Sequence, residues 1–207
     1  MAAESTLRNM VLCLTAVCLI CAAILGCVYA VTYEPIQASA QKALAASIGQ
    51  VLPEGGELSE AKEIEGYEYY VQTKDGVPSA YAIKSTSVGF GGPLTLMVGV
   101  LPDGTVYNTS VLSHSETPGL GAKCQTDTKF MDQFKGFSPD KSLVVKKDGG
   151  DVDAITASTI TSRAYTLAVS CAVNVVKLIR GEEVAQDAFT GASAAAKHEK
   201  EGGRTNE

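Results

Sequence analysis

Residues 94–112 read LTLMVGVLPDGTVYNTSVL, and this stretch decides the fold. It contains two runs of strand-favouring residues, Leu94–Leu101 and Thr105–Leu112, separated by the turn sequence Pro102-Asp103-Gly104. Strand-like runs joined by so short a turn predict a β-hairpin. Upstream, Tyr67–Thr73 and Ala80–Ser87 flank a second turn signal at residues 75–76. We therefore expect a mostly antiparallel sheet.

Helical segments are expected on both sides of this sheet. Apolar residues at helical spacing predict an amphipathic helix from Pro35 to about Gln50, followed by a loop over residues 49–60. Downstream we expect a short helix over Thr128–Phe134, a further strand over Ser142–Lys147, and a long helix over Thr161–Ile179 that Gly181 ends. A sheet with helices at its flanks makes this an α+β domain.

The composition narrows the class of protein. The chain has 207 residues and a formal net charge of -6, with 17 basic and 23 acidic residues. An acidic chain lacks the clustered cations that bind phosphate backbones, so no nucleic-acid partner is expected. The length suits one domain with an anchor.

A transmembrane helix is expected over residues 10–31, because no charged residue occurs between Met10 and Val31. A run of about 20 apolar residues can span a bilayer and exceeds the core of a cleaved signal, roughly 7–15 residues. Arg8 precedes the run and no basic residue follows until Lys42, which indicates a cytoplasmic N-terminus and an outer soluble domain. The segment Ile24–Cys27 also resembles a lipoprotein cleavage box, so lipidation of Cys27 stays an open alternative.

The expected organisation has five parts. They are a cytoplasmic N-terminus (1–9), the transmembrane helix (10–31), a linker with an amphipathic helix (32–66), a folded domain (67–190) and a flexible tail (191–207). The folded domain contains Cys124 and Cys171, which could form a disulfide or remain two buried thiols.

Hydroxyl side chains gather where the long helix is expected to begin. Residues 153–162 read DAITASTITS, and five of the seven residues from Thr156 to Ser162 carry a hydroxyl. One of them is expected to cap the helix, and a cap alone would explain Ser or Thr there. A helix N-terminus also binds anions through its free N–H groups and its dipole. The cluster therefore suits a phosphorylated ligand as well.

A second motif, SHSETPGLGAK, occupies residues 113–123 after a predicted strand. Its Pro118-Gly119 turn and its glycines would let the backbone approach a ligand closely, as would the upstream turn GFGGP at residues 89–93. Two purely structural loops explain the same residues equally well.

Together these two motifs resemble the FMN-binding domain family, and most of all its Rnf-type G subunits from ion-translocating ferredoxin:NAD oxidoreductase complexes. That family's attachment motif usually reads S-G-A-T-x-T-S, and Thr159 stands here at the acceptor threonine, with Thr156, Ala157 and Ser158 as departures from the pattern. The resemblance implies a covalent phosphoester between FMN and Thr159. The other cofactor-binding residues it implies are Thr161, Ser162, His114, Glu116, Thr117, Gly119, Leu120, Gly121 and Lys123.

The resemblance further implies an electron-transfer subunit in a bacterial cytoplasmic membrane, with its soluble domain on the periplasmic face. Its partners would be Fe–S and flavin subunits of the complex, and a flavin transferase would attach the FMN. Alternatives are the corresponding subunit of a sodium-translocating NADH:quinone oxidoreductase and a cofactor-free membrane-anchored scaffold. An independent enzyme is not expected, because the sequence has no catalytic triad, metal-ligand spacing, P-loop or dinucleotide fingerprint.

Overall fold

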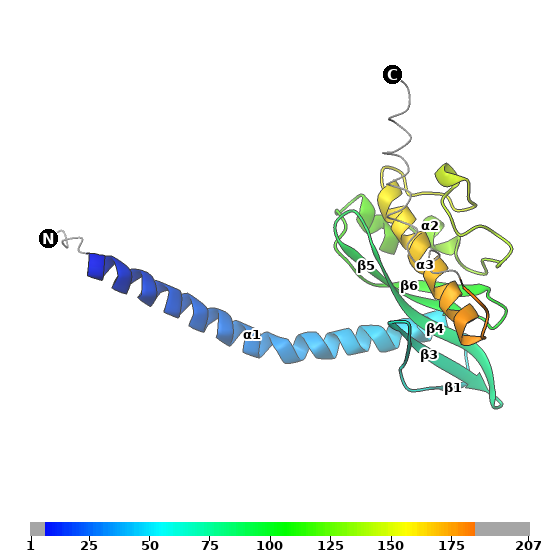
Figure 1. The fold of residues 1–207 in the computed structure, drawn as a ribbon, viewed down its shortest axis with the longest axis horizontal. Helices are drawn as coiled ribbons and strands as arrows, with labels where there is room; N and C mark the ends of the chain where they lie inside the picture. Colours follow the sequence, from blue (N-terminus) through cyan, green and yellow to red (C-terminus); the bar gives the residue numbers. More distant parts are fainter. Residues whose placement is uncertain (1–6, 185–207) are drawn as a thin grey trace, which may run out of the picture. The chain divides into compact units, whose positions relative to one another are not determined.

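The computed structural model describes residues 7–184, in two compact units that divide between Ala43 and Leu44. The expected tail at 191–207 and the first six residues of the expected cytoplasmic segment lie outside the described range. Figure 1 shows the fold, with a long N-terminal helix, a sheet and a C-terminal helix.

Helix α1 runs from Leu7 to Val51 and contains the expected membrane span. It is the one helix among residues 7–184 that is long and apolar enough to cross a membrane. The expectation of two helices joined by a linker is wrong, since α1 continues through Pro35. A proline removes one helical hydrogen bond, and the Ala-rich residues around this one favour the helix enough to carry it on.

The expected antiparallel sheet is confirmed, and it contains two strands, β1 and β2, that the sequence did not indicate. Its order is β1-β3-β4-β5-β6, with β2 also pairing with β3, and every pairing is antiparallel. The strands are β1 (Glu57–Leu58), β2 (Lys62–Ile64), β3 (Tyr67–Lys74), β4 (Val77–Val88), β5 (Pro93–Val100) and β6 (Val106–His114). Strand β1 lies inside the segment expected to be a loop, and β2 lies in the expected linker.

The β5–β6 hairpin forms at the turn that the sequence indicated. The Leu101 N–H donates to the Thr105 carbonyl over 2.8 Å, and the Asp103 carboxylate accepts from the Thr105 N–H over 2.9 Å. Gly104 has a φ of 89°, which glycine adopts without strain. Asp75 and Gly76 also have positive φ, which suits a tight two-residue turn between β3 and β4.

Two apolar clusters cover the two faces of the sheet. Helix α3 (Thr159–Ile179) packs on β4 and β5 and buries residues such as Ile83, Val98 and Tyr165. The end of α1 forms the second cluster with the opposite face, where Val51 packs near Met97. An added Cβ at Gly99 would lie 1.7 Å from the Val51 carbonyl oxygen, so this contact requires glycine.

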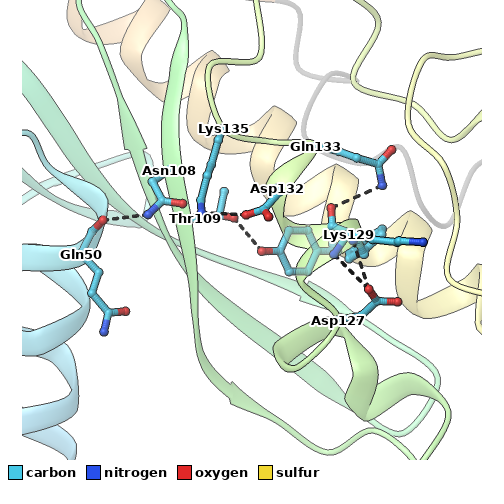
Figure 2. A network of polar contacts seen from close by, with 10 residues as sticks. Gln50, Asn108, Thr109, Asp127, Lys129, Asp132, Gln133 and Lys135 are labelled. Carbon is cyan, nitrogen blue, oxygen red and sulfur yellow. Dashed lines mark hydrogen bonds and ion pairs between the residues drawn. The ribbon is translucent and has the colours of Figure 1, made fainter.

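Hydrogen bonds connect strand β6 with the end of α1 and with α3 (Figure 2). The Asn108 side chain donates to the Gln50 carbonyl over 2.8 Å, which holds the end of α1. The Thr109 and Tyr165 hydroxyls lie 2.7 Å apart and connect β6 with α3. Beyond β6 the chain forms a short 3-10 helix, η1 (Gly121–Gln125), and α2 (Thr128–Asp132), which the Asp127 carboxylate caps.

The strand expected over Ser142–Lys147 is wrong. This segment leads into a 3-10 turn, η2 (Lys146–Asp148), and its only ladder contact is a single bridge between Val145 and Val152. The Asp151 carboxylate accepts from the Ser142 N–H over 2.8 Å and closes the loop on itself. Local hydrogen bonding therefore replaces a sheet partner here.

Two further expectations concern α3 and the cysteines. Gly181 ends α3 as expected: its N–H donates to the Leu178 carbonyl, and the Glu182 N–H donates to the Lys177 carbonyl. Cys124 and Cys171 are buried thiols that are not joined by a disulfide, so the disulfide alternative is not realised in this structure. Burial raises the pKa of Cys124 to about 11, and the negative charge of Glu116 adds to the shift.

Candidate functional site

The N-terminus of α3 has no side-chain cap, because the nearby hydroxyls form other contacts. Ala157 has a φ of 61°, a left-handed conformation that turns the chain into the helix. Ser158 occupies the N-cap position, but its hydroxyl makes no capping bond, so the expected cap is wrong. Instead, Ser162 Oγ accepts from the Ile155 N–H and donates to the Ser158 carbonyl, each over 2.9 Å. The first N–H groups of α3 are therefore left without a side-chain cap, which is the arrangement that binds anions.

A buried carboxylate joins three segments beside this helix end. Glu116 is 6% exposed, and its Oε2 accepts from the Thr161 hydroxyl over 2.7 Å. Its Oε1 accepts from the Gly91 N–H over 3.3 Å. Since a buried carboxylate is costly without hydrogen-bond donors, these contacts fix the SHSETPGLGAK loop against α3 and against the Gly-rich turn after β4.

Glycines make room for this carboxylate. A Cβ added at Gly89 would lie 2.0 Å from Glu116 Oε1, and one at Gly121 would lie 2.4 Å from Oε2. The Gly-rich turn and the Gly-Leu-Gly segment, which the sequence presented as separate motifs, thus enclose one side chain. Close packing rather than a left-handed backbone explains the glycine at both positions.

These segments enclose a cavity of about 380 Å³, a volume typical of small-molecule sites. Its polar wall contains Thr159 and the Glu116–Thr161 pair, and its rim contains apolar side chains from three different segments. Phe90, Leu120 and Ile160 are 70%, 44% and 49% exposed, respectively. Exposed apolar and aromatic groups around a polar wall suit a flat aromatic ligand with a charged end. The remaining lining residues are Thr117, Gly121, Ala157 and Ser158.

Charged side chains of η2 and α3 form contacts close to Thr159. Lys147 Nζ donates to Thr159 Oγ1 over 3.1 Å. The neighbouring Asp148 accepts two hydrogen bonds from Arg163, over 2.7 Å from Nε and 2.6 Å from Nη2. The hydrogen bonds and positive charge of Arg163, with Lys147 also contributing, hold the pKa of Asp148 below its usual value. The turn η2 is thereby fastened to the first turns of α3.

The structure separates the sequence-predicted site residues into two groups. Those that line the cavity are Thr159, Thr161, Glu116, Thr117, Leu120 and Gly121. Those that do not are Ser162, His114, Gly119 and Lys123. Ser162 is buried, and its hydroxyl makes the two hydrogen bonds given above. His114 accepts from the Glu116 N–H through Nδ1 over 3.2 Å and contacts the Gln125 amide oxygen over 3.1 Å, so it positions the loop.

Sequence reasoning missed Phe90, Ile160 and Lys147 as site residues. Phe90 was visible as an aromatic residue within a Gly-rich turn, and Ile160 as an apolar residue between two threonines of the attachment motif. Lys147 gave no signal, because its segment was expected to be a strand and no local pattern connects it to Thr159.

Comparison with known proteins places this chain in a family. The family model of the FMN-binding domain matches residues 89–174. The chain is 36% identical over 171 residues to the G subunit of the proton-translocating ferredoxin:NAD(+) oxidoreductase complex of Clostridium ljungdahlii, covering 81% of this chain and 90% of the relative. It is also 36% identical over 174 residues to the G subunit of the ion-translocating oxidoreductase complex of Shewanella oneidensis, covering 75% and 82%.

Among solved structures, the chain is similar to the C subunit of the Na(+)-translocating NADH-quinone reductase of Parabacteroides distasonis. Their sequences are 27% identical, the match covers 60% of this chain and 77% of that one, and the TM-score is 0.43.

Proposed function

Because the chain belongs to the FMN-binding domain family of ion-translocating oxidoreductase G subunits, we propose that it is an electron-transfer subunit that carries FMN covalently on Thr159. The observation that carries the proposal is the position of Thr159. Its side chain lies on the wall of the cavity, at the N-terminus of α3, where the helix has no side-chain cap. A phosphoester to this oxygen would place the phosphate against free N–H groups.

The residues of the cavity fit an FMN at this position. The apolar rim formed by Phe90, Leu120 and Ile160 would pack on the isoalloxazine ring, and the first turn of α3 would hold the phosphate. The hydrogen-bonded pair Glu116–Thr161 fixes the loop that contributes Thr117, Leu120 and Gly121 to the cavity lining. FMN, when bound, supplies the electron-carrying chemistry, and the protein positions the cofactor and tunes its electronics.

The chain is anchored to a membrane through α1 and works with the other subunits of a redox complex. We further propose that the membrane is the bacterial cytoplasmic membrane and that the flavin domain lies on its periplasmic side. The positive charge of Arg8 before the apolar run supports this orientation. The one span that α1 provides within residues 7–184 offers no pathway for ions, so ion translocation would belong to other subunits of the complex.

Covalent attachment has a physical rationale on this face of the membrane. A cofactor that dissociates outside the cell is lost by dilution, whereas a phosphoester retains it irrespective of binding affinity. Attachment would require a flavin transferase as a maturation partner.

The proposal is tested by expressing the full chain with an active flavin transferase and recording flavin fluorescence on a denaturing gel. We expect a fluorescent band that Thr159→Val abolishes. The control Thr126→Val removes an exposed hydroxyl that lies outside both the attachment motif and the cavity, and should keep the fluorescence. A dark wild-type chain, with the transferase active on a second substrate, would refute covalent attachment.

A further inference from the structure

The turn η2 presents one ammonium group to the hydroxyl of Thr159. Lys147 Nζ lies 3.1 Å from Thr159 Oγ1, although the two residues are separated by the loop 148–158. An ammonium can only donate hydrogen bonds, so the threonine oxygen accepts here and its own hydrogen stays free. The contact therefore orients the oxygen without competing for the proton that must leave during esterification.

Several independent constraints hold this lysine in place. The fork of Arg163 binds both oxygens of Asp148, the residue directly after Lys147, and Arg163 belongs to the second turn of α3. The bridge between Val145 and Val152 closes the loop at its base. An added Cβ at Gly150 would lie 2.1 Å from the Val144 carbonyl oxygen, so the loop is packed against itself.

The other basic residue of the turn is directed elsewhere. Lys146 Nζ forms an ion pair with Asp153 over 2.7 Å and makes no contact with Thr159. Lys147, in contrast, has the Thr159 hydroxyl as the only side-chain hydrogen-bond partner the structure gives it within residues 7–184. Lys147 therefore contacts the Thr159 oxygen, whereas the adjacent Lys146, which has the same charge, does not.

We propose that Lys147 is the positioning residue for flavin attachment: it orients the Thr159 oxygen before esterification and pairs with the phosphate of the ester afterwards. This inference rests on the proposed function. The attachment itself needs an FMN donor activated as a phosphoanhydride. The Thr159 oxygen forms a bond to the FMN phosphorus, the anhydride P–O bond breaks, the nucleotide leaving group takes that electron pair, and the hydroxyl proton passes to a base of the transferase.

The phosphodiester formed in this way carries one negative charge, which a cation beside the helix N-terminus stabilises. Removal of the ammonium should therefore slow attachment and weaken the stabilisation that the attached phosphate confers. Because Lys147 is exposed, its contribution is screened by salt, and the difference between the wild-type and variant rates should shrink at high ionic strength.

The test uses the full chain, purified without flavin, incubated with transferase and flavin dinucleotide, and sampled over time on denaturing gels. We expect Lys147→Ala to slow attachment by about fivefold to tenfold, the size of one charge-assisted hydrogen bond at an exposed position. Lys147→Arg should recover most of the rate, and Lys146→Ala should react as the wild type does.

A second variant separates positioning from charge. Asp148→Ala keeps Lys147 but releases the turn from Arg163, and it should also slow attachment. Circular dichroism of each unmodified variant verifies that it is folded, and the rise in melting temperature on attachment should be smaller for Lys147→Ala than for the wild type.

The outcomes distinguish this inference from the proposed function. A wild-type chain that never becomes fluorescent refutes the proposed function. A fluorescent wild type with equal rates for Lys147→Ala, or equal losses for Lys146→Ala and Lys147→Ala, overturns the role of Lys147 while leaving the flavin on Thr159.

Discussion

Thr161→Val should destabilise the protein because it removes the short hydrogen bond to a buried carboxylate. The two side chains are 1% and 6% exposed, and the Thr161 hydroxyl lies 2.7 Å from Glu116 Oε2. Valine has the same shape as threonine, so no cavity is created. Glu116 would keep only the weaker hydrogen bond from the Gly91 N–H over 3.3 Å.

The magnitude follows from the charge of the acceptor. A hydrogen bond to a charged group contributes about 1.5–3 kcal/mol, and its loss leaves the carboxylate short of donors. We expect a loss of about 2 kcal/mol in the free energy of unfolding, which corresponds to a decrease of about 4–8 °C in melting temperature for a domain of this size.

The matched control is Thr166→Val, in the same helix. Thr166 is 2% exposed, and its hydroxyl donates over 2.8 Å to the Ser162 carbonyl, a neutral acceptor within the helix. Its loss should cost about 1 kcal/mol or less. Adding Glu116→Gln to Thr161→Val should recover part of the loss, because an unpaired neutral amide is less costly to bury than a carboxylate.

The assay is thermal unfolding of the full chain in detergent, followed by the near-ultraviolet circular dichroism of its tyrosines, since the chain has no tryptophan. If Thr161→Val and Thr166→Val differ by less than about 0.5 kcal/mol, the carboxylate does not depend on this bond and the reasoning is refuted.

Two further predictions concern packing and alkaline pH. Gly99→Ala should lower the free energy of unfolding by about 3 kcal/mol, because its Cβ would lie 1.7 Å from the Val51 carbonyl oxygen. Gly49→Ala, whose Cβ would have nothing within 4 Å, should raise it by about 0.5 kcal/mol, and denaturant unfolding measures both variants. Because burial raises the pKa of Cys124 from 9.0 to about 11, the unfolded chain loses this proton first, and stability should fall as pH rises from about 9 to 11. Melting temperatures measured across this range should decline less steeply for Cys124→Ala, and equal slopes would contradict the assignment.

The elements that the sequence predicted correctly are those specified by neighbouring residues. The β5–β6 hairpin follows from strand-favouring runs on both sides of Pro102-Asp103-Gly104, and the end of α3 follows from the conformational freedom of Gly181. Turn-forming residues and helical periodicity act over a few neighbouring residues, so the sequence alone is enough to recognise them. The apolar run was accessible in the same way, whereas Thr159 became a candidate acceptor only through the resemblance to a family motif.

The wrong predictions concern groups whose hydrogen-bond partners could not be identified from neighbouring residues. Residues 142–147 have the composition of a strand, but a strand needs a partner, and here the Asp151 carboxylate and the loop closure satisfy the backbone locally. The hydroxyls around the start of α3 look like caps, but Ser162, inside the helix, accepts instead from the Ile155 N–H. Propensity does not determine which of several possible hydrogen-bond partners a group finds.

The sequence by itself determined the anchor, the type of fold, the glycine-rich loops and Thr159 as the candidate attachment point. Only the tertiary structure brought Phe90, Glu116 and Ile160 around one cavity and set Lys147 beside Thr159. The physical reason is that a binding site is defined by distances between residues far apart in the chain. Those distances are fixed only when the sheet, α3 and the loop around η2 pack together, and no local pattern encodes them.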